Sequence, residues 1–269
     1  TTDVANVAET DAFTLTVSDG TSSSAPATIT IEIVDDVPTA VADAGYGVVE
    51  DGASNVSGNV LANDISGADA PKAFDGWSSS DTAVINELSQ YGTLTQNGDG
   101  TWSYTLNNGL AATQALSGSF NKDFVLHYTM KDADGDTSSS TLTINVKGAN
   151  DGPTVTVETG NPGNANDQVH ESGLDGIGSN GAANTEFATG SFKLSDPDGL
   201  GDVKSVTING GSAILIANLV GTNIAGAHGT LTITGYDAST GVATYSYKLT
   251  SATTDVANVA ETDAFTLTV

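Results

Sequence analysis

The chain has 269 residues and a formal net charge of −26, because seven lysines face 33 acidic residues and there is no arginine. Eight of the acids are Glu and 25 are Asp, a residue that favours turns and caps over helix interiors. We therefore expect the acidic side chains to lie in loops. Such a charge should repel nucleic acid, anionic membranes and anionic substrates, so neither nucleic acid nor a membrane is an expected partner. The absence of Cys excludes disulfides, zinc–thiolate sites and a Cys nucleophile.

The composition indicates a fold made of strands and turns. Thr, Val and Ser are frequent along the chain, as are Gly, Asn and Asp, so the sequence predicts an all-β fold. No stretch approaches 18 continuous apolar residues, and the first residues include no basic region. We therefore expect neither membrane insertion nor a signal peptide in this segment.

Residues 1–17 and residues 253–269 have the same sequence, TTDVANVAETDAFTLTV, at an offset of 252 residues. An identity of this length indicates one period of a tandem array with a short overlap. We interpret the chain as a piece of a longer repetitive protein.

Alternating apolar and polar residues predict strands along the whole chain. The expected strands are 27–34, 40–42, 59–62, 92–96, 101–106, 124–130, 140–146, 155–157, 192–194, 229–234 and 243–249. The dipeptides Asn97-Gly98 and Asp99-Gly100 predict a tight turn between two of them. No amphipathic helix is expected, although 81–88 could form a helical turn or more.

Two junctions divide the chain, at 35–39 and at 150–154. Each places an Asp-Asp or Asn-Asp pair, then any residue, then Pro-Thr, between two predicted strands. Proline restricts its own backbone and that of the preceding residue, so these connections should be short and stiff. We expect three parts: 1–36 as the end of a preceding domain, 37–151 as a complete domain, and 152–269 as a domain that lacks its last strand.

Five acidic clusters lie between the predicted strands, at 49–52, 61–69, 131–136, 169–173 and 195–202. Ca²⁺ takes 6–8 oxygen ligands, and short Asp side chains in a Gly-containing loop can converge on one ion. The EF-hand is excluded because no Glu follows at the twelfth position, while transition metals would prefer His or Cys. A single Asp-X-Asp-Gly segment is usually only a turn, but repetition at five places favours calcium binding.

Enzymatic activity is not expected. The chain has no Gly-X-Ser-X-Gly motif around a serine nucleophile, and its acids lie in turns without an aromatic platform for a sugar. His127 lies within an alternating strand, which favours a structural role. Trp77, Trp102 and Tyr104 are expected to pack in the core or across a hairpin.

The segments 49–52 (VEDG), 58–64 (GNVLAND), 92–95 (GTLT) and 97–104 (NGDGTWSY) resemble the cadherin-like, VCBS-type repeat. Such repeats occur in giant bacterial RTX-type adhesins. The match spans nearly all of 37–151, is looser over 152–269, and extends to 10–36 as the closing strands of the same module. The resemblance implies tandem Ig-like β-sandwich domains, joined end to end by short linkers that bind Ca²⁺, at the bacterial cell surface.

The strand order of that family implies which residues would be ligands at each junction. The first junction would use Glu9, Asp11, Asp35, Asp36, Asn63, Asp64, Asp69, Asp132, Asp134 and Asp136. The second would use Asn150, Asp151, Asp196, Asp198 and Asp202, with Glu50, Asp51 and Asp123 from the opposite pole of the middle domain. Glu171 would serve the far end of the third domain.

Two functions follow as hypotheses. In the first, the chain is a calcium-rigidified extender of a large repetitive adhesin, which projects a distal binding domain from the cell and has neighbouring repeats as its partners. In the second, it is an adhesin module that binds a carbohydrate or a protein. The divided domains also suggest head-to-tail strand exchange between molecules, with frayed termini as the alternative.

Overall fold

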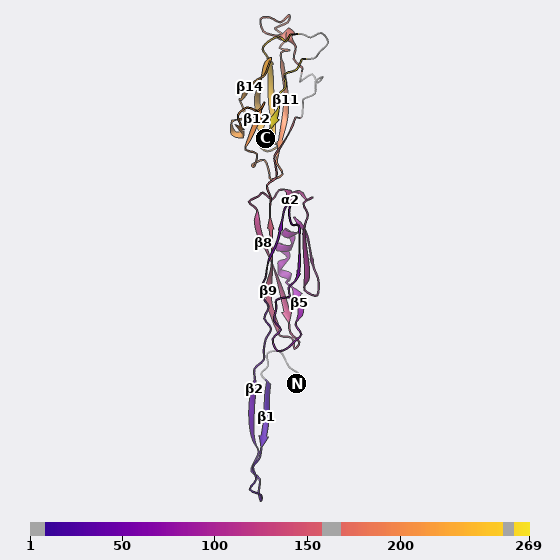
Figure 1. The fold of residues 1–269 in the computed structure, drawn as a ribbon, viewed down its shortest axis with the longest axis vertical. Coiled ribbons are helices and arrows are strands. Elements are labelled where there is room, and N and C mark those ends of the chain that lie inside the picture. The colour runs from indigo at the N-terminus through magenta and orange to yellow at the C-terminus, as the bar shows by residue number, and fades with distance from the viewer. Residues whose placement is uncertain (1–8, 158–167, 255–260) are drawn as a thin grey trace. The chain divides into compact units, whose positions relative to one another are not determined.

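The computed structural model describes residues 9–157, 168–254 and 261–269, which form two compact units, Thr1–Ala149 and Asn150–Val269 (Figure 1). The first eight residues, including the start of the duplicated segment, lie outside the described residues. We call the two units unit 1 and unit 2.

Unit 1 begins with a hairpin of two antiparallel strands, β1 (Glu9–Leu15) and β2 (Ala27–Ile33). Phe13 stands directly opposite Ile29 in this pairing. The hairpin forms a two-stranded sheet of its own, and every residue of β2 is exposed. Alternation of Thr with Ile predicts β2 correctly, but its apolar face has no core to cover it among the described residues.

The rest of unit 1 is a sandwich of two sheets, in the orders β3-β9-β8-β5 and β4-β7-β6. The strands are β3 (Asp43–Val49), β4 (Asn55–Asn59), β5 (Ala73–Trp77), β6 (Gly92–Gln96), β7 (Thr101–Leu106), β8 (Asn121–Lys131) and β9 (Thr137–Lys147). The strand pairs are antiparallel except for β3 and β9, which run parallel. The helical elements are η1 (Ser79–Asp81), α1 (Thr82–Leu88) and α2 (Ala111–Gln114).

The core of this sandwich follows the period of two that the sequence shows. In β8, Phe124, Leu126 and Tyr128 point inward and are almost fully buried, while the residues between them are exposed. Trp102 and Tyr104 of β7 are also buried, so both aromatic residues pack in the core as expected. Successive residues of a strand face opposite sides of the sheet, so this pattern buries one face and exposes the other to solvent.

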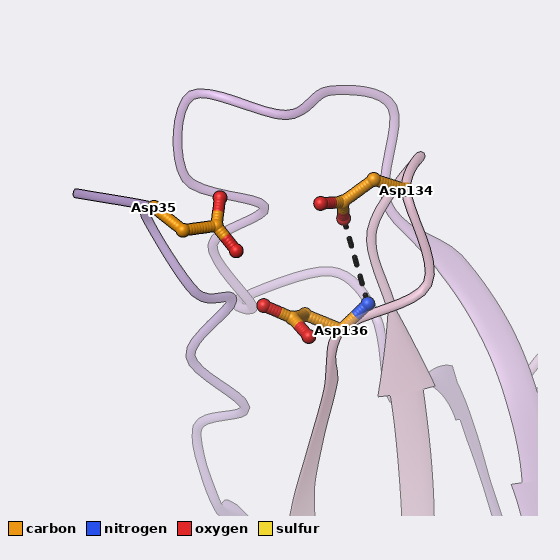
Figure 2. A group of neighbouring side chains, drawn as sticks. All are labelled: Asp35, Asp134 and Asp136. Atoms are coloured by element: carbon orange, nitrogen blue, oxygen red, sulfur yellow. Dashed lines mark hydrogen bonds between the residues drawn. The ribbon is translucent and has the colours of Figure 1, made fainter. Parts of the chain in front are cut away.

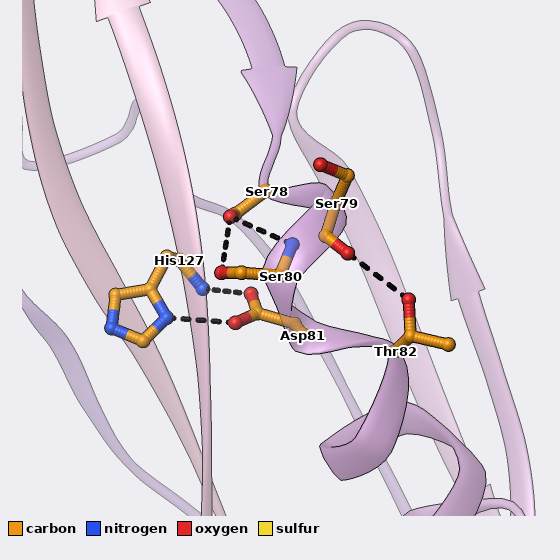
Figure 3. A network of polar contacts seen from close by, with 6 residues as sticks. All are labelled: Ser78, Ser79, Ser80, Asp81, Thr82 and His127. Carbon is orange, nitrogen blue, oxygen red and sulfur yellow. Dashed lines mark hydrogen bonds and ion pairs between the residues drawn. The ribbon is translucent and has the colours of Figure 1, made fainter.

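His127 ties the short helix to the sheet, as Figure 3 shows. The buried Asp81 carboxylate accepts the backbone N–H of His127 at 2.6 Å and lies 2.9 Å from its Nδ1 atom. The Ser78 hydroxyl caps the preceding turn by accepting the N–H of Ser80. This arrangement gives His127 a structural role, in line with its place in an alternating strand.

The predicted strand at 59–62 is wrong. The strand is β4 and ends at Asn59, after which the chain turns. The Asn59 side-chain oxygen accepts the N–H of Leu61 at 2.9 Å, and its backbone carbonyl accepts that of Ala62 at 3.0 Å. Asn readily bonds the backbone two residues ahead, so it stops the strand although Val60 and Leu61 are apolar.

Unit 2 is a second sandwich, with sheets in the orders β10-β11-β16-β15-β14 and β13-β12-β17. The strands are β10 (Thr154–Val157), β11 (Phe187–Ser195), β12 (Ser205–Ile208), β13 (Ile214–Leu215), β14 (Asn223–Ala225), β15 (Gly229–Asp237), β16 (Val242–Leu249) and β17 (Leu267–Thr268). Two short helical turns, η2 (Glu171–Gly173) and η3 (Ile216–Asn218), join them. Phe192, Leu194 and Ile233 lie at the centre of its core.

The predicted all-β class of Ig-like sandwiches is therefore confirmed: in each unit two sheets enclose a separate apolar core. The division into three domains stays a prediction, because the hairpin β1–β2 and the first sandwich fall in one unit. In the described part of the chain, no helix is long and apolar enough to cross a membrane.

Candidate metal centres

Three carboxylates from two distant parts of the sequence meet in unit 1, as Figure 2 shows. Asp35 follows β2, whereas Asp134 and Asp136 lie between β8 and β9. One oxygen atom from each of the three side chains lies within 4.8 Å of the others. We call this group the first acidic cluster. Like charges this close repel one another unless a proton or a cation lies between them.

The β8–β9 loop is shaped by its own first Asp. The Asp132 Oδ1 atom accepts the backbone N–H groups of Gly135 at 3.1 Å and Asp136 at 2.8 Å, and Gly135 has a φ of 108°. Asp132 Oδ2 and Asp134 Oδ2 are buried, and no described residue donates a hydrogen bond to either of them. The loop thus holds buried oxygen acceptors without donors, an arrangement that suits a cation with oxygen ligands.

Burial and neighbouring carboxyl groups raise the pKa of two carboxyl groups in this cluster. The pKa of Asp134 is raised, first by the adjacent Asp132 carboxyl and next by burial. The pKa of Asp136 is raised by burial and then by the neighbouring Asp35. A bound cation would act in the opposite direction, because it favours the ionised form of each ligand.

Further predicted residues surround the first acidic cluster. Asp36 accepts the N–H of Ala68 at 2.8 Å, and the carbonyl oxygen of Asp69 accepts that of Ala133 at 3.0 Å. Residue 36, the 61–69 loop and the β8–β9 loop are thereby held together. The Asn63 amide donates to the backbone carbonyls of Val41 and Ala42, each at 3.3 Å.

Asp64 is buried and belongs to a separate pair of acids. Its Oδ1 atom accepts the Val41 N–H at 2.7 Å and the Tyr128 hydroxyl at 2.9 Å. Asp43, which lies outside the five acidic clusters of the sequence, is only 5% exposed. Burial, and next the charge of Asp64, raise the pKa of Asp43 to about 6. The feature that could have identified Asp43 is an acidic residue at an inward-facing position of β3.

Asp43→Asn should stabilise the ion-free protein at pH 7.5 by about 1–2 kcal/mol, since a pKa shift of one unit corresponds to about 1.4 kcal/mol. A carboxyl whose pKa is raised by folding costs stability as the pH rises from its ordinary value of 3.8 through about 6. Urea unfolding in EDTA at pH 7.5 and at pH 4 checks this. The gain should shrink at the lower pH, and an equal gain at both would contradict the assignment.

A second acidic cluster lies in unit 2. Asp196, Asp198 and Asp202 each place one carboxylate oxygen within 4.8 Å of the others. Asp198 Oδ2 accepts the N–H of Asp151 at 2.9 Å, so the predicted residue Asp151 adjoins this cluster. Asp198 Oδ1 is buried with no donor among the described residues. The predicted grouping of these residues is therefore present as geometry, and their role as ligands stays a prediction.

Other predicted ligands join neither acidic cluster. Both oxygens of the buried Glu50 accept hydrogen bonds, from Ala149 N–H at 3.0 Å and from the Gln114 amide at 3.3 Å. Asp51 accepts from the Asn108 amide and Asp123 from the Asn145 amide. Glu9 and Asp11 in β1 and Glu171, which accepts from Thr253, also belong to neither cluster. The Asn150 amide donates to the backbone carbonyl of Asp151 at 2.7 Å.

Asp263, the second copy of Asp11, has a role that the sequence did not reveal. Its carboxylate accepts the N–H groups of Ala227, His228 and Gly229 at 2.8–3.1 Å and the Tyr247 hydroxyl at 2.8 Å. Burial opposes ionisation, but these donors outweigh it and lower the pKa of Asp263. The carboxylate therefore fastens the last segment of unit 2 to the turn before β15.

Asp263→Asn should destabilise unit 2 by about 1–2 kcal/mol, because the amide nitrogen cannot accept the hydrogen bonds that one carboxylate oxygen accepts. Because the pKa of Asp263 is lowered, its contribution to the stability of unit 2 is present at a pH above the ordinary Asp pKa of 3.8. That contribution is lost as the pH falls below this value. Hydrogen exchange of residues 227–229, compared between the variant and the parent chain, measures the effect. Unchanged protection would contradict this role for Asp263.

Residues 35–148 match the family model described as a bacterial cadherin-like domain. The chain is also 31% identical over 128 residues to a protein named calcium-binding lectin RapA2, from Rhizobium johnstonii; the match covers 45% of this chain. It spans about half the length of that relative, 51%. Calcium binding and lectin activity are thus named for a relative that shares part of this sequence.

Among solved structures, protocadherin gamma B7 extracellular cadherin domains 1–4 align with 90% of this chain and 49% of their own, at 15% identity and a TM-score of 0.39. Protocadherin gamma B2 domains 1–5 align with 84% of this chain and 36% of their own, at 16% identity and a TM-score of 0.38. The fold class rests on the strand order of the two sandwiches.

Proposed function

We propose that this chain is a calcium-rigidified extender segment of a large, repetitive bacterial surface adhesin, with an extracellular location. The observation that carries the proposal is the first acidic cluster. It joins Asp35, in the segment that leads out of the hairpin β1–β2, to Asp134 and Asp136 in a loop about 100 residues later. A divalent cation in this cluster would fix that segment against the sandwich.

The donor set fits Ca²⁺ better than other metals. The first acidic cluster offers only oxygen atoms, and His or Cys is not among its members. Calcium accepts carboxylates, backbone carbonyls and water in a flexible shell, whereas Mg²⁺ demands a stricter octahedron. Asp35, Asp134 and Asp136 would hold the ion in unit 1, and Asp196, Asp198 and Asp202 would do so in unit 2.

Rigidity is the property that an extender needs. The 35–39 connection already contains Pro38, which narrows the backbone conformations open to it. A bound ion would remove much of the remaining freedom and would cancel carboxylate repulsion at the same point. The duplicated segment supports this function as well, because a spacer gains length by repetition while a single binding site does not.

Calorimetric titration of the chain with CaCl₂, and separately with MgCl₂, tests the proposal. We expect at least two calcium sites and weaker binding of magnesium. In the double variant Asp134→Asn/Asp198→Asn, the heat of calcium binding to both clusters should be lost. A chain that binds no calcium, or binds both ions equally well, would contradict calcium-dependent stiffening.

The second candidate function is a ligand-binding module, and the similarity to a protein named as a lectin favours it. Against it, Trp102 and Tyr104 are 2% and 0% exposed, so neither of them can stack on a sugar from solvent. A glycan array probed with the chain in calcium separates the two functions. Saturable binding to defined glycans would favour the module, and its absence would favour the extender.

A further inference from the structure

The same nine residues occur in two environments in this chain, at 9–17 and at 261–269. In unit 2, Phe265, Leu267 and Val269 pack against the core, and the Phe265 ring meets the Tyr247 ring edge-on at 6.0 Å. Their counterparts lie on the hairpin at Phe13, Leu15 and Val17, which are 53%, 50% and 73% exposed. A sequence that forms part of a core in one place therefore faces solvent in the other.

The partner strand extends this exposed apolar surface. Ile29, Ile31 and Ile33 of β2 are each 52% exposed. Ile29 is paired directly with Phe13, and directly paired residues of antiparallel strands share a face, so the isoleucines and Phe13 lie on one side of the hairpin. Asp11 and Glu9 stand opposite Ile31 and Ile33 on the same side, so the face is apolar with an acidic residue beside each of these two isoleucines. A group of exposed large apolar residues on a two-stranded hairpin marks an interaction surface.

Unit 2 has a strand edge that matches the hairpin. Among the described residues, β17 lies at the edge of its sheet, beside β12. The Thr266 carbonyl accepts the Asn209 N–H at 2.8 Å, and the Thr266 N–H donates to the Asn209 side-chain oxygen, also at 2.8 Å. Thr266 therefore directs its backbone groups toward the β12 side. Backbone groups of alternate residues point to opposite edges of a strand, so those of Phe265 and Leu267 point to the outer edge.

The hairpin uses that other set of backbone groups. The carbonyl of Val17, the counterpart of Val269, accepts the Ser24 N–H at 2.7 Å, and the Val17 N–H donates to the Ser24 hydroxyl at 3.0 Å. A strand with this sequence thus pairs with β12 through one edge in unit 2 and with β2 through the opposite edge in the hairpin. A strand with this sequence can pair with both neighbours at once, without a change of register.

Unit 1 already contains the arrangement that would result. Its larger sheet places β8 between β5 and β9, and β8 and β9 form a hairpin through eleven directly paired positions. The order β12, then β1, then β2 would reproduce the order β5-β8-β9.

We propose that the hairpin β1–β2 of one chain inserts into unit 2 of a second copy of this chain. There β1 takes the place of residues 261–269 beside β12, and β2 becomes a new strand at the outer edge. The inserted residues are identical to those of the displaced segment, so they can make the same contacts, and Asp11 takes the position of Asp263. Exchange also buries the isoleucines of β2, which are exposed on the hairpin. This assembly is separate from calcium binding, since none of its contacts involves an acidic cluster.

Sedimentation velocity of the full chain over a concentration series tests the proposal. We expect the mass to rise with concentration, and Phe13→Ala or Ile31→Asp to weaken association about tenfold or more, as for a buried anchor of an interface. Phe265→Ala should not weaken it, because Phe265 leaves the core on exchange. Val220→Asp is the matched control, since Val220 is also 52% exposed but lies in unit 2 outside this surface.

A chain that carries a second copy of residues 18–36 after Val269 should associate more weakly, because its own copy of β2 can fill the edge. A mass that stays monomeric at every concentration would overturn the proposal. So would equal losses for Phe13→Ala and Phe265→Ala, or an effect of Val220→Asp as large as that of Ile31→Asp. Undiminished association of the extended chain would also overturn it.

Discussion

Millimolar calcium should raise the free energy of unfolding of this chain by about 2.7 kcal/mol for each site at a hundredfold excess of the ion over its Kd. The reason is that the ion binds the folded clusters and not the unfolded chain. In the ion-free protein the same carboxylates repel one another, as the raised pKa values of Asp134 and Asp136 indicate. Thermal unfolding in EDTA and in 5 mM CaCl₂ measures the difference.

An ionic-strength control separates binding from screening. Magnesium chloride at the same concentration screens the general charge of −26 as calcium chloride does, so any added stabilisation by calcium reports specific binding. Equal unfolding temperatures in the two salts would contradict the presence of calcium sites.

Asp134→Asn should have opposite effects with and without calcium. In EDTA the variant should be more stable than the parent chain, because one of the crowded charges is removed. In calcium it should be less stable, since a charged ligand is lost and the affinity for calcium should fall by about tenfold or more. Urea unfolding of both chains, with and without the ion, measures this crossover.

Asp99→Asn provides a control with the same change of charge. Asp99 caps the tight turn between β6 and β7, where its Oδ1 atom accepts the Thr101 N–H at 3.0 Å, and it lies in neither acidic cluster. Asn retains that acceptor, so this variant should respond to calcium as the parent chain does. If Asp134→Asn and Asp99→Asn responded alike, the first acidic cluster would not be a calcium site.

Much of the fold could be predicted because the signals were local. The alternation at 124–130 identifies β8, and the Asn-Gly and Asp-Gly pairs place the turn between β6 and β7. The end of β4 could not be read from hydropathy, because the Asn59 side chain decides it. The strand β5 was missed, since its sequence AFDGW contains a Gly and an Asp within only five residues.

The types of residue in the candidate site could be predicted from the sequence. Which of these residues lie close together could be predicted only in part. The Asp-X-Asp-Gly pattern identifies Asp134 and Asp198, but only the folded chain shows which acids approach one another. Glu50 illustrates the difference, because its two partners are Ala149 and Gln114, far along the chain. Asp43 was missed because one acid in a strand looks like any exposed polar residue until its face of the sheet is known.

Small-angle X-ray scattering of the full chain in EDTA and in 5 mM CaCl₂ tests the extender function most directly. Ions that fix the segments around residues 35 and 151 should narrow the range of orientations of the parts they join. We predict a larger maximum dimension and a narrower distribution of distances with calcium, and no such change in Asp134→Asn/Asp198→Asn. Identical scattering of the parent chain with and without calcium would contradict a calcium-rigidified extender.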